Sequence, residues 1–326
     1  MKKISPRLFY LYDQNGTVHH IFLIFIILVI SFIGINVLKT SSTHAKIIGS
    51  PIKALGFNYC LDDKNSGEDS GTKVDAYKCN DTSAQDWFIE GLYIKHGNNC
   101  LTLNDAYKVL LDRCSDSPNQ RWLTDYSNLL NPYTRLCLTI PSGKSGVQLE
   151  GQLCQRNSQS QSWKLQKQSC SAQTAGGMIA CSAIIEWQVW QKNGSDHLQL
   201  LTKYTDGAPT EEWCADFVSY VYKEAGLPFN KGEVDGWDEN NANNIVNQGF
   251  SIRYPAKYIP KAGDIGYFSY GGGHVEIVVA GGVHPTFIYG NSSKKDPQTG
   301  NGEMATNSLT RVGEEGSLEY YLVPNI

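Results

Sequence analysis

The chain has 326 residues, which is enough for two or three domains. Charged residues make up 18% and aromatic residues 11% of the chain, which is typical of folded domains with apolar cores and argues against long disorder. The net charge of −4 and the lack of a long basic run argue against nucleic acid as a partner.

A membrane segment is predicted near the N-terminus. Three positive residues come first, at Lys2, Lys3 and Arg7. The apolar run 21–35 follows without a charged residue, and the segment 18–38 is long enough to span a bilayer of about 30 Å. The positive flank predicts a cytoplasmic N-terminus and an extracellular location for the bulk of the chain. Residues 1–49 hold either an uncleaved anchor, which the length of the run favours, or a long signal peptide cut near 43–45. An uncleaved anchor makes the membrane a partner.

A unit of about 40 residues occurs three times between residues 50 and 168. Each copy begins with a cysteine followed by a leucine, contains a second cysteine and ends in Gln-x-Trp. The openings are Cys60-Leu61, Cys100-Leu101 and Cys137-Leu138, and the closing motifs are Gln85-Asp86-Trp87, Gln120-Arg121-Trp122 and Gln161-Ser162-Trp163. One copy could not bury its apolar face alone, so three copies predict a closed β structure of pseudo-threefold symmetry.

The nine cysteines predict four disulfides and one free thiol. In an exported chain the pairs inside the repeats close loops of similar length and add about 3 kcal/mol each. These pairs are Cys60–Cys79, Cys100–Cys114 and Cys137–Cys154. Cys170 and Cys181 are close enough to pair across the polar linker 169–177. Cys214 is then left alone, which indicates a reactive thiol, the alternative being a small apolar residue on a buried helix face.

The three openings, internal cysteine pairs and closing motifs resemble a ricin B-type β-trefoil lectin domain over about 50–168. The resemblance implies an all-β fold in which the Gln and Trp of the closing motif are structural. It also implies a sugar site in the first repeat, where Asp62 lies two residues after the first cysteine and Tyr77 two before the second. Asp75 lies at the position of a polar helper. A tyrosine ring can stack on a sugar while a carboxylate accepts hydrogen bonds from its hydroxyls.

The predicted sugar site is restricted to the first repeat by the residues that the other repeats carry at the equivalent positions. The second and third repeats carry Thr102 and Thr139 in place of the aspartate, so their sites are predicted to be inactive. Ala84 stands where the family has an asparagine beside the closing glutamine. Asp62 could instead be a turn residue, since it belongs to an Asp-Asp pair.

The last segment, 178–326, reads as an α+β domain. A helix is predicted over 178–191 and another over 239–248, and the apolar spacing of 211–226 predicts a helix that is capped by Thr210 and carries Cys214 in its first turns. Three strands follow, over 264–268, 274–279 and 286–291. Together with the earlier segments this gives a multidomain chain: an N-terminal membrane segment, an all-β trefoil and an α+β papain-like domain.

Three residues of the last domain form a candidate catalytic set. Cys214 at a helix start has a favoured thiolate, His274 opens a strand, and Asn291 lies at the end of the next strand, which are the nucleophile, base and orienter of a thiol hydrolase. Glu276 is the alternative orienter because it shares a strand face with His274, although it could also be an ordinary paired strand residue.

Four motifs in this domain resemble the CHAP family, the cysteine, histidine-dependent amidohydrolases and peptidases. They are Trp-Cys-Ala-Asp-Phe-Val at 213–218, Lys-Ala-Gly-Asp-Ile at 261–265, Gly-His-Val-Glu-Ile-Val at 273–278 and Gly-Asn at 290–291. The resemblance implies hydrolysis of peptidoglycan, at N-acetylmuramoyl–L-alanine bonds or at peptide cross-links. It implies Cys214 as nucleophile, His274 as base and Asn291 as orienter.

Other polar residues are predicted to have structural roles. His197 and His284 are expected at the surface, and Asp264 is expected to fix the turn before its strand. No residue spacing typical of a metal site is present in the sequence, so we expect no metal and no cofactor. The predicted function is an exported, peptidoglycan-cleaving cysteine hydrolase with a lectin module. Two alternatives stay open: a carbohydrate-binding surface protein with a degenerate cysteine domain, and a hydrolase of another amide substrate.

Overall fold

The computed structural model describes residues 49–67, 69–165, 174–192, 196–205, 207, 212–227, 229, 249–270, 273–309 and 318–325. The apolar segment 18–38, the helix predicted over 239–248 and Cys170 lie outside these residues. Within the described ranges no helix is both long and apolar enough to cross a membrane.

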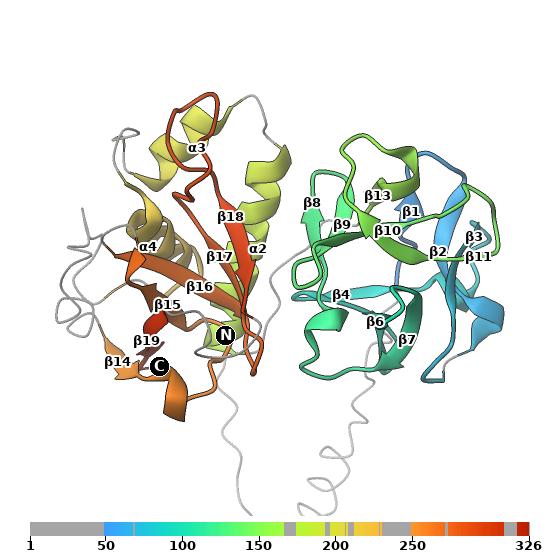
Figure 1. Cartoon of the computed structure of the whole chain (residues 1–326), viewed down its shortest axis with the longest axis horizontal. Coiled ribbons are helices and arrows are strands. Elements are labelled where there is room, and N and C mark those ends of the chain that lie inside the picture. Colours follow the sequence, from blue (N-terminus) through green and yellow to red (C-terminus); the bar gives the residue numbers. More distant parts are fainter. Residues whose placement is uncertain are drawn as a thin grey trace, which may run out of the picture. The chain divides into compact units, whose positions relative to one another are not determined.

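The first part of the chain is all β, as predicted. Figure 1 shows short strands and turns throughout its blue-to-green region. The strands are β1 (Lys53–Ala54), β2 (Tyr59–Asp63), β3 (Val74–Lys78), β4 (Phe88–Glu90), β5 (Tyr93–His96), β6 (Asn99–Leu103), β7 (Val109–Arg113), β8 (Leu123–Asp125), β9 (Asn128–Asn131), β10 (Leu136–Thr139), β11 (Val147–Gln148), β12 (Glu150–Leu153) and β13 (Trp163–Lys164). They form antiparallel sheets in the orders β11-β3-β2-β1-β13, β4-β5-β6-β7 and β12-β10-β9-β8.

The tryptophans of the closing motifs hold the core of this β domain. Trp87, Trp122 and Trp163 are all buried in one apolar cluster with leucines from every repeat. Each indole Nε1 donates a hydrogen bond to the carbonyl of the leucine that follows the first cysteine of its repeat, over 2.8, 2.9 and 2.9 Å respectively. The same side chain therefore fills the core and ties the end of each repeat to its beginning.

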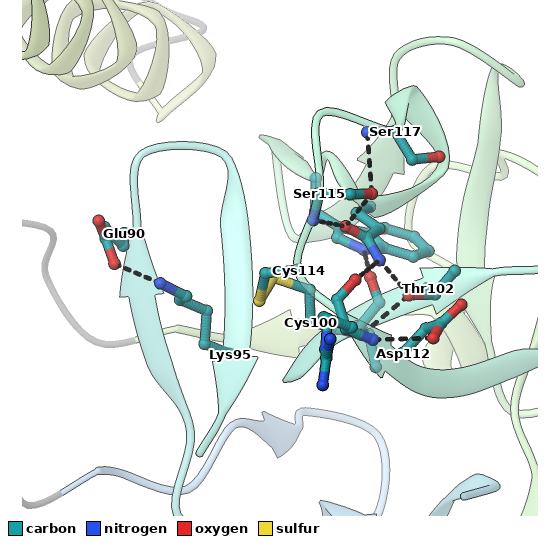
Figure 2. The surroundings of a disulfide bond; sticks show 12 residues. Glu90, Lys95, Cys100, Thr102, Asp112, Cys114, Ser115 and Ser117 are labelled. Atoms are coloured by element: carbon teal, nitrogen blue, oxygen red, sulfur yellow. Dashed lines mark hydrogen bonds and ion pairs between the residues drawn. A yellow bond between two sulfur atoms is a disulfide. The ribbon is translucent and has the colours of Figure 1, made fainter. Parts of the chain in front are cut away.

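The glutamines of the closing motifs fix one turn per repeat. In the second repeat the Gln120 side chain accepts a hydrogen bond from the Ser115 N–H and donates to Thr102 Oγ1 and to the Arg113 carbonyl. Gln85 and Gln161 make the corresponding bonds in the other two repeats. Figure 2 shows Thr102 and Ser115 beside the disulfide of the second repeat. The structural role expected of these glutamines is confirmed.

The disulfides predicted inside the repeats are present. Cys60–Cys79, Cys100–Cys114 and Cys137–Cys154 are all bonded. Cys181 is disulfide-bonded as well, and its predicted partner lies outside the described residues. Cys214 is not disulfide-bonded, as predicted.

The second part of the chain is α+β, as Figure 1 shows in its yellow-to-red region. The helices are α2 (Ala175–Lys192), α3 (His197–Tyr204) and α4 (Cys214–Glu224), and the strands are β14 (Phe250–Arg253), β15 (Ile265–Phe268), β16 (His274–Ala280), β17 (Thr286–Tyr289), β18 (Ala305–Ser308) and β19 (Leu318–Pro324). The antiparallel sheet has the order β14-β19-β15-β16-β17-β18. The predicted helix at 178–191 and the three predicted strands are all observed within a few residues.

Alternation along β16 separates two apolar clusters. Val275, Ile277 and Val279 belong to the cluster formed with α2 and α4. Val278 belongs to a second cluster, to which β15, β17 and β19 contribute together with Leu309. Because side chains alternate along a strand, His274 and Glu276 lie on the same face as Val278. Both are buried.

Arg121 joins the β domain to the α+β domain within the compact unit formed by residues 49–326. Its guanidinium is fully buried and donates hydrogen bonds to the carbonyls of Gly281 and His284 and to Thr286 Oγ1. Trp187 of α2 adds a hydrogen bond to the Thr124 carbonyl, over 2.6 Å. A buried guanidinium that donates to several acceptors is costly to leave unpaired, so Arg121 ties the two domains together.

Candidate functional sites

Cys214 is the first residue of α4, and its side chain is 1% exposed. The helix was predicted to begin near Thr210, which lies outside the described residues. Trp213 precedes the cysteine with non-helical dihedral angles. Since the first N–H groups of a helix have no partner within the helix, Cys214 lies where a thiolate and a nearby oxyanion are favoured. The Asp216 side chain, in the first turn, is buried.

Trp213 is held rigidly next to the candidate nucleophile. Its indole Nε1 donates to the Gly302 carbonyl over 3.1 Å. Its ring stacks between Trp190 and Tyr204, at centroid distances of 5.3 and 5.6 Å. It also lies against Gly290, where an added Cβ would fall 2.4 Å from ring atoms. This contact explains the glycine of the Gly-Asn motif.

His274 opens β16 in a buried aromatic setting. It is 5% exposed, and the rings of Tyr270 and Tyr289 each lie 5.0 Å from its imidazole, centroid to centroid. Burial lowers the pKa of His274 to about 4. The imidazole is therefore neutral at pH 7, which is the form that can accept a proton. Helix α4 packs against β16, and Cys214 shares an apolar cluster with Val275. His274 is not part of this cluster, because its side chain alternates to the other face of β16.

Glu276 is the carboxylate next to this imidazole. It is fully buried, and its Oε1 lies 3.8 Å from His274 Nε2. The Tyr270 hydroxyl donates to the same Oε1 over 2.6 Å. A carboxylate held at this distance favours the protonated imidazole, which opposes the effect of burial.

Asn291 differs from its predicted position. β17 ends at Tyr289, and Asn291 lies beyond it with a φ of 57°. A residue in this left-handed conformation cannot continue a strand, and asparagine tolerates it better than most residues. Its Oδ1 accepts a hydrogen bond from the Gly302 N–H over 3.3 Å. Among the described residues, no hydrogen bond or ion pair joins Asn291 to His274.

His197 was predicted at the surface, and this prediction is wrong. The side chain is buried, its Nδ1 lies 2.6 Å from Asp296 Oδ2, and its Nε2 lies 3.0 Å from the Trp190 carbonyl. The imidazole also stacks on the Trp190 ring at 4.1 Å. This pairing lowers the pKa of Asp296 despite the opposing effect of burial. The loop 291–303 is thereby joined to α3, which the spacing of His197 and Asp296 in the sequence does not reveal.

Two further polar predictions have mixed outcomes. His284 is half-buried rather than at the surface, and its ring lies 5.8 Å from that of Tyr133. Asp264 fixes its turn as expected, because its Oδ2 accepts hydrogen bonds from the Lys261 N–H and the Tyr258 hydroxyl. Within the part of the chain that the structure describes, no group of three or more His, Cys, Asp or Glu residues could hold a metal ion.

The predicted sugar-site residues come together on β2 and β3. Asp62 faces Asp75 across the two strands, and Cys60 faces Tyr77. Leu61, Val74 and Ala76 point into the core, so Asp62, Asp75 and Tyr77 share the opposite face. Tyr77 is 47% exposed, whereas Asp62 and Asp75 are 7% and 3% exposed. An exposed ring therefore lies beside two buried carboxyl groups.

Both carboxyl groups hold their protons more strongly than usual. Burial raises the pKa of Asp62, although a hydrogen bond from Gln85 to its Oδ2 over 2.8 Å opposes the shift. Burial and the nearby Asp62 raise the pKa of Asp75 to about 6, and Lys64 opposes this shift.

Comparisons with known proteins find matches for segments in both parts of the chain. Residues 50–163 match the family model of the ricin-type beta-trefoil lectin domain, and residues 203–291 match that of the CHAP domain. A comparison with curated proteins found no match.

Several solved structures are similar to part of this chain. An agglutinin from Abrus precatorius is 23% identical with a TM-score of 0.32, over 35% of this chain and 46% of the agglutinin, so the match spans less than half of that protein. The β-trefoil lectin of a Vibrio vulnificus hemolysin is 20% identical with a TM-score of 0.32, over 37% of this chain and 97% of that one. The designed three-fold symmetric protein ThreeFoil is 19% identical with a TM-score of 0.32, over 36% and 97%. The family models, together with the fold and the repeated contacts, establish that this chain joins a ricin-type β-trefoil lectin domain to a CHAP domain.

Proposed function

We propose that the chain is an exported cysteine hydrolase that cleaves amide bonds of peptidoglycan and is held on glycan by its trefoil. The observation that carries the proposal is a cysteine outside any disulfide at the start of α4, a helix that packs against the strand that opens with a buried, neutral histidine. The CHAP match agrees with an amidase or peptidase. The disulfides support export, because such bonds persist in oxidising compartments.

The reaction follows from the chemistry of these groups. His274 takes the proton from the Cys214 thiol, and the thiolate attacks the scissile carbonyl carbon. Backbone N–H groups at the start of α4 stabilise the oxyanion of the tetrahedral intermediate. The intermediate collapses to a thioester as the amine leaves with the proton carried by His274. Water, deprotonated by His274, then hydrolyses the thioester and restores the thiol.

Two residues compete for the role of orienting His274, namely Asn291 and Glu276. The place of Asn291 in the Gly-Asn motif supports Asn291 as the orienting residue. The separation of 3.8 Å between Glu276 Oε1 and His274 Nε2, with Tyr270 holding the carboxylate, supports Glu276. We assign the role to Glu276, and we assign to Asn291 the shaping of the loop through Gly302.

The tautomer of His274 separates these two assignments. At 3.8 Å the carboxylate is beyond hydrogen-bond distance of Nε2 in this structure. If it closes to bond Nε2 in the working enzyme, it favours the Nε2–H tautomer and leaves Nδ1 as the base. Nitrogen-15 NMR of the histidine rings, with His274→Ala to identify the signal, should show this tautomer in the wild type and in Asn291→Ala. The tautomer should be lost in Glu276→Gln. Loss in Asn291→Ala with retention in Glu276→Gln would return the role to Asn291.

Glycan attachment is proposed to use the first repeat alone. Tyr77 offers an exposed ring, and Asp62 and Asp75 lie beside it. The equivalent position to Asp62 is a threonine in the other repeats, where its hydroxyl is engaged by the closing glutamine.

Zymography on purified cell walls tests the hydrolase. The wild type should clear peptidoglycan, and Cys214→Ala should clear none. Cys181 is a disulfide cysteine, so the matched control is another small buried residue on α4, Ala215→Ser, which should retain clearing. Clearing by Cys214→Ala equal to that of the wild type would reject the mechanism. Glycan binding by a wild type that clears nothing would favour a carbohydrate-binding protein with a degenerate cysteine domain.

A further inference from the structure

The three repeats offer an internal comparison at the sugar site. In each repeat the residue two after the first cysteine faces a residue of the next paired strand. The facing pairs are Asp62–Asp75 in the first repeat, Thr102–Leu110 in the second and Thr139–Glu150 in the third. Only the first repeat places two carboxyl groups opposite each other, and directly facing residues have Cβ atoms about 5 Å apart.

The fold does not require a charge at the first of these positions. In the second and third repeats the closing glutamine donates to a threonine hydroxyl, over 3.0 and 2.9 Å. Each threonine in turn donates to the carbonyl of its cysteine, over 2.9 and 2.8 Å. A neutral hydroxyl is thus a sufficient acceptor for the hydrogen bond that the glutamine side chain donates. Asp62 performs the same task with a carboxylate, which adds a negative charge that the turn does not need.

Asp75 adds a second carboxylate without a structural partner. Its side chain is 3% exposed, and its Oδ1 accepts no hydrogen bond although it is buried. The facing residue on β11, Gln148, directs its amide to the Val109 carbonyl. Two like charges placed side by side in a buried setting are unfavourable unless a cation joins them.

The surrounding charges do not supply that cation directly. Lys64 lies close enough to lower the pKa of Asp75, and His96 acts on Asp62. Lys64 is exposed, and His96 directs its Nε2 to the Ser83 carbonyl over 2.8 Å. Tyr77, on the same face, presents its ring to solvent.

We propose that the first repeat binds an amino sugar with a free ammonium group, such as a glucosamine unit of a de-N-acetylated glycan, in preference to its N-acetylated form. The ammonium lies between Asp62 and Asp75 and donates to the unpartnered oxygen of Asp75, while the pyranose ring stacks on Tyr77. The free amine can bind as an ammonium, and Asp75, whose pKa is raised to about 6 by burial and by Asp62, is mainly ionised at pH 7. An N-acetyl group carries no charge and would leave the carboxylates unpaired. This inference rests on the sugar site proposed above.

Isothermal titration calorimetry with two oligosaccharides tests the preference. The full chain is titrated at pH 7 with the β-1,4-linked glucosamine tetramer and with the N-acetylglucosamine tetramer. The wild type should bind the glucosamine tetramer at least tenfold more tightly. At pH 5, where Asp75 takes up a proton, the preference should fall severalfold.

Two variants and one control locate the effect. Asp75→Asn should bring the affinities for the two tetramers within about twofold of each other. Asp62→Thr should do the same. It introduces the threonine that the other repeats carry at this position, and it keeps an acceptor for the Gln85 side chain. Glu150→Gln, at the Asp75-equivalent position of the third repeat, should keep the full preference.

Four results would overturn the inference: equal affinities in the wild type, tighter binding of the acetylated tetramer, no binding of either, or a preference that survives Asp75→Asn. Acetylated-tetramer binding that Tyr77→Ala abolishes would keep the sugar site while removing the amino-sugar preference. Wall clearing in the zymogram is independent of all these results and so reports on the hydrolase alone.

Discussion

Asp75→Asn should stabilise the protein at neutral pH, although it should impair the proposed amino-sugar site of the first repeat. The folded state raises the pKa of Asp75 from 3.8 to about 6. The folded protein therefore binds the Asp75 proton more strongly than the unfolded chain does, and stability is lost as pH rises from about 4 to about 6. Above pH 6 the wild type carries the whole penalty. Asparagine has no charge and carries none of it.

The size of the gain follows from the shift. A shift of about two units corresponds to at most about 3 kcal/mol. The Asp75 side chain is only 3% exposed, but it lies beside the exposed Tyr77 and within reach of the exposed Lys64, so we expect a smaller gain of about 1 kcal/mol. For a domain of this size the melting temperature should rise by roughly 3 °C at pH 7.5.

Thermal unfolding of wild type and variant at pH 7.5 and pH 3.5 measures this gain. The stabilisation should be present at pH 7.5 and absent at pH 3.5, where both proteins are neutral at this position. Asp105→Asn removes an exposed carboxylate of the second repeat and should change little at either pH. A gain of the same size at both pH values, or a loss at pH 7.5, would refute the view that Asp75 is an uncompensated charge.

The remaining predictions concern the catalytic domain and the contacts that support the fold. Glu276→Gln should lower kcat for wall hydrolysis by about 10- to 100-fold with little change in KM, because the protonated His274 loses the carboxylate that stabilises it. An unchanged kcat would exclude a role for the Glu276 carboxylate. Activity of the wild type should fall as pH drops through about 4, where His274 becomes protonated, and an acid limb above pH 6 in kcat/KM would contradict its burial. Arg121→Met should cost about 3 kcal/mol in urea unfolding, since it leaves buried carbonyls without donors, while the exposed Arg113→Met should cost little. Gln120→Ala should destabilise the trefoil by about 2 kcal/mol, and a neutral result would show that the turn does not depend on its three hydrogen bonds.

The trefoil could be predicted from sequence because its key contacts recur. The indole of Trp87 reaches the Leu61 carbonyl across 26 residues, and Trp122 and Trp163 repeat that contact at similar separations. A pattern that occurs three times fixes both the spacing and the residue types. The disulfides follow for the same reason, because each lies within one repeat.

The catalytic domain was less predictable because its supporting contacts occur once and span long separations. His197 and Asp296 are 99 residues apart, and nothing in either local sequence indicates the pairing. The contacts of Arg121 with the carbonyls of Gly281 and His284 likewise depend on how the two domains meet. The left-handed conformation of Asn291 accompanies its hydrogen bond to Gly302 and the packing of Trp213 on Gly290, and a strand pattern contains neither contact.

The central claim is that Cys214 cleaves amide bonds in peptidoglycan. Mass spectrometry of the fragments released from purified, defined peptidoglycan tests it most directly, because each broken amide bond frees one amine and one carboxylate at an identifiable place. We predict amine-terminated fragments from the wild type, either free stem peptides or opened cross-links, and none from Cys214→Ala. Fragments cut only at glycosidic bonds, or the same amide fragments from Cys214→Ala, would contradict the claim.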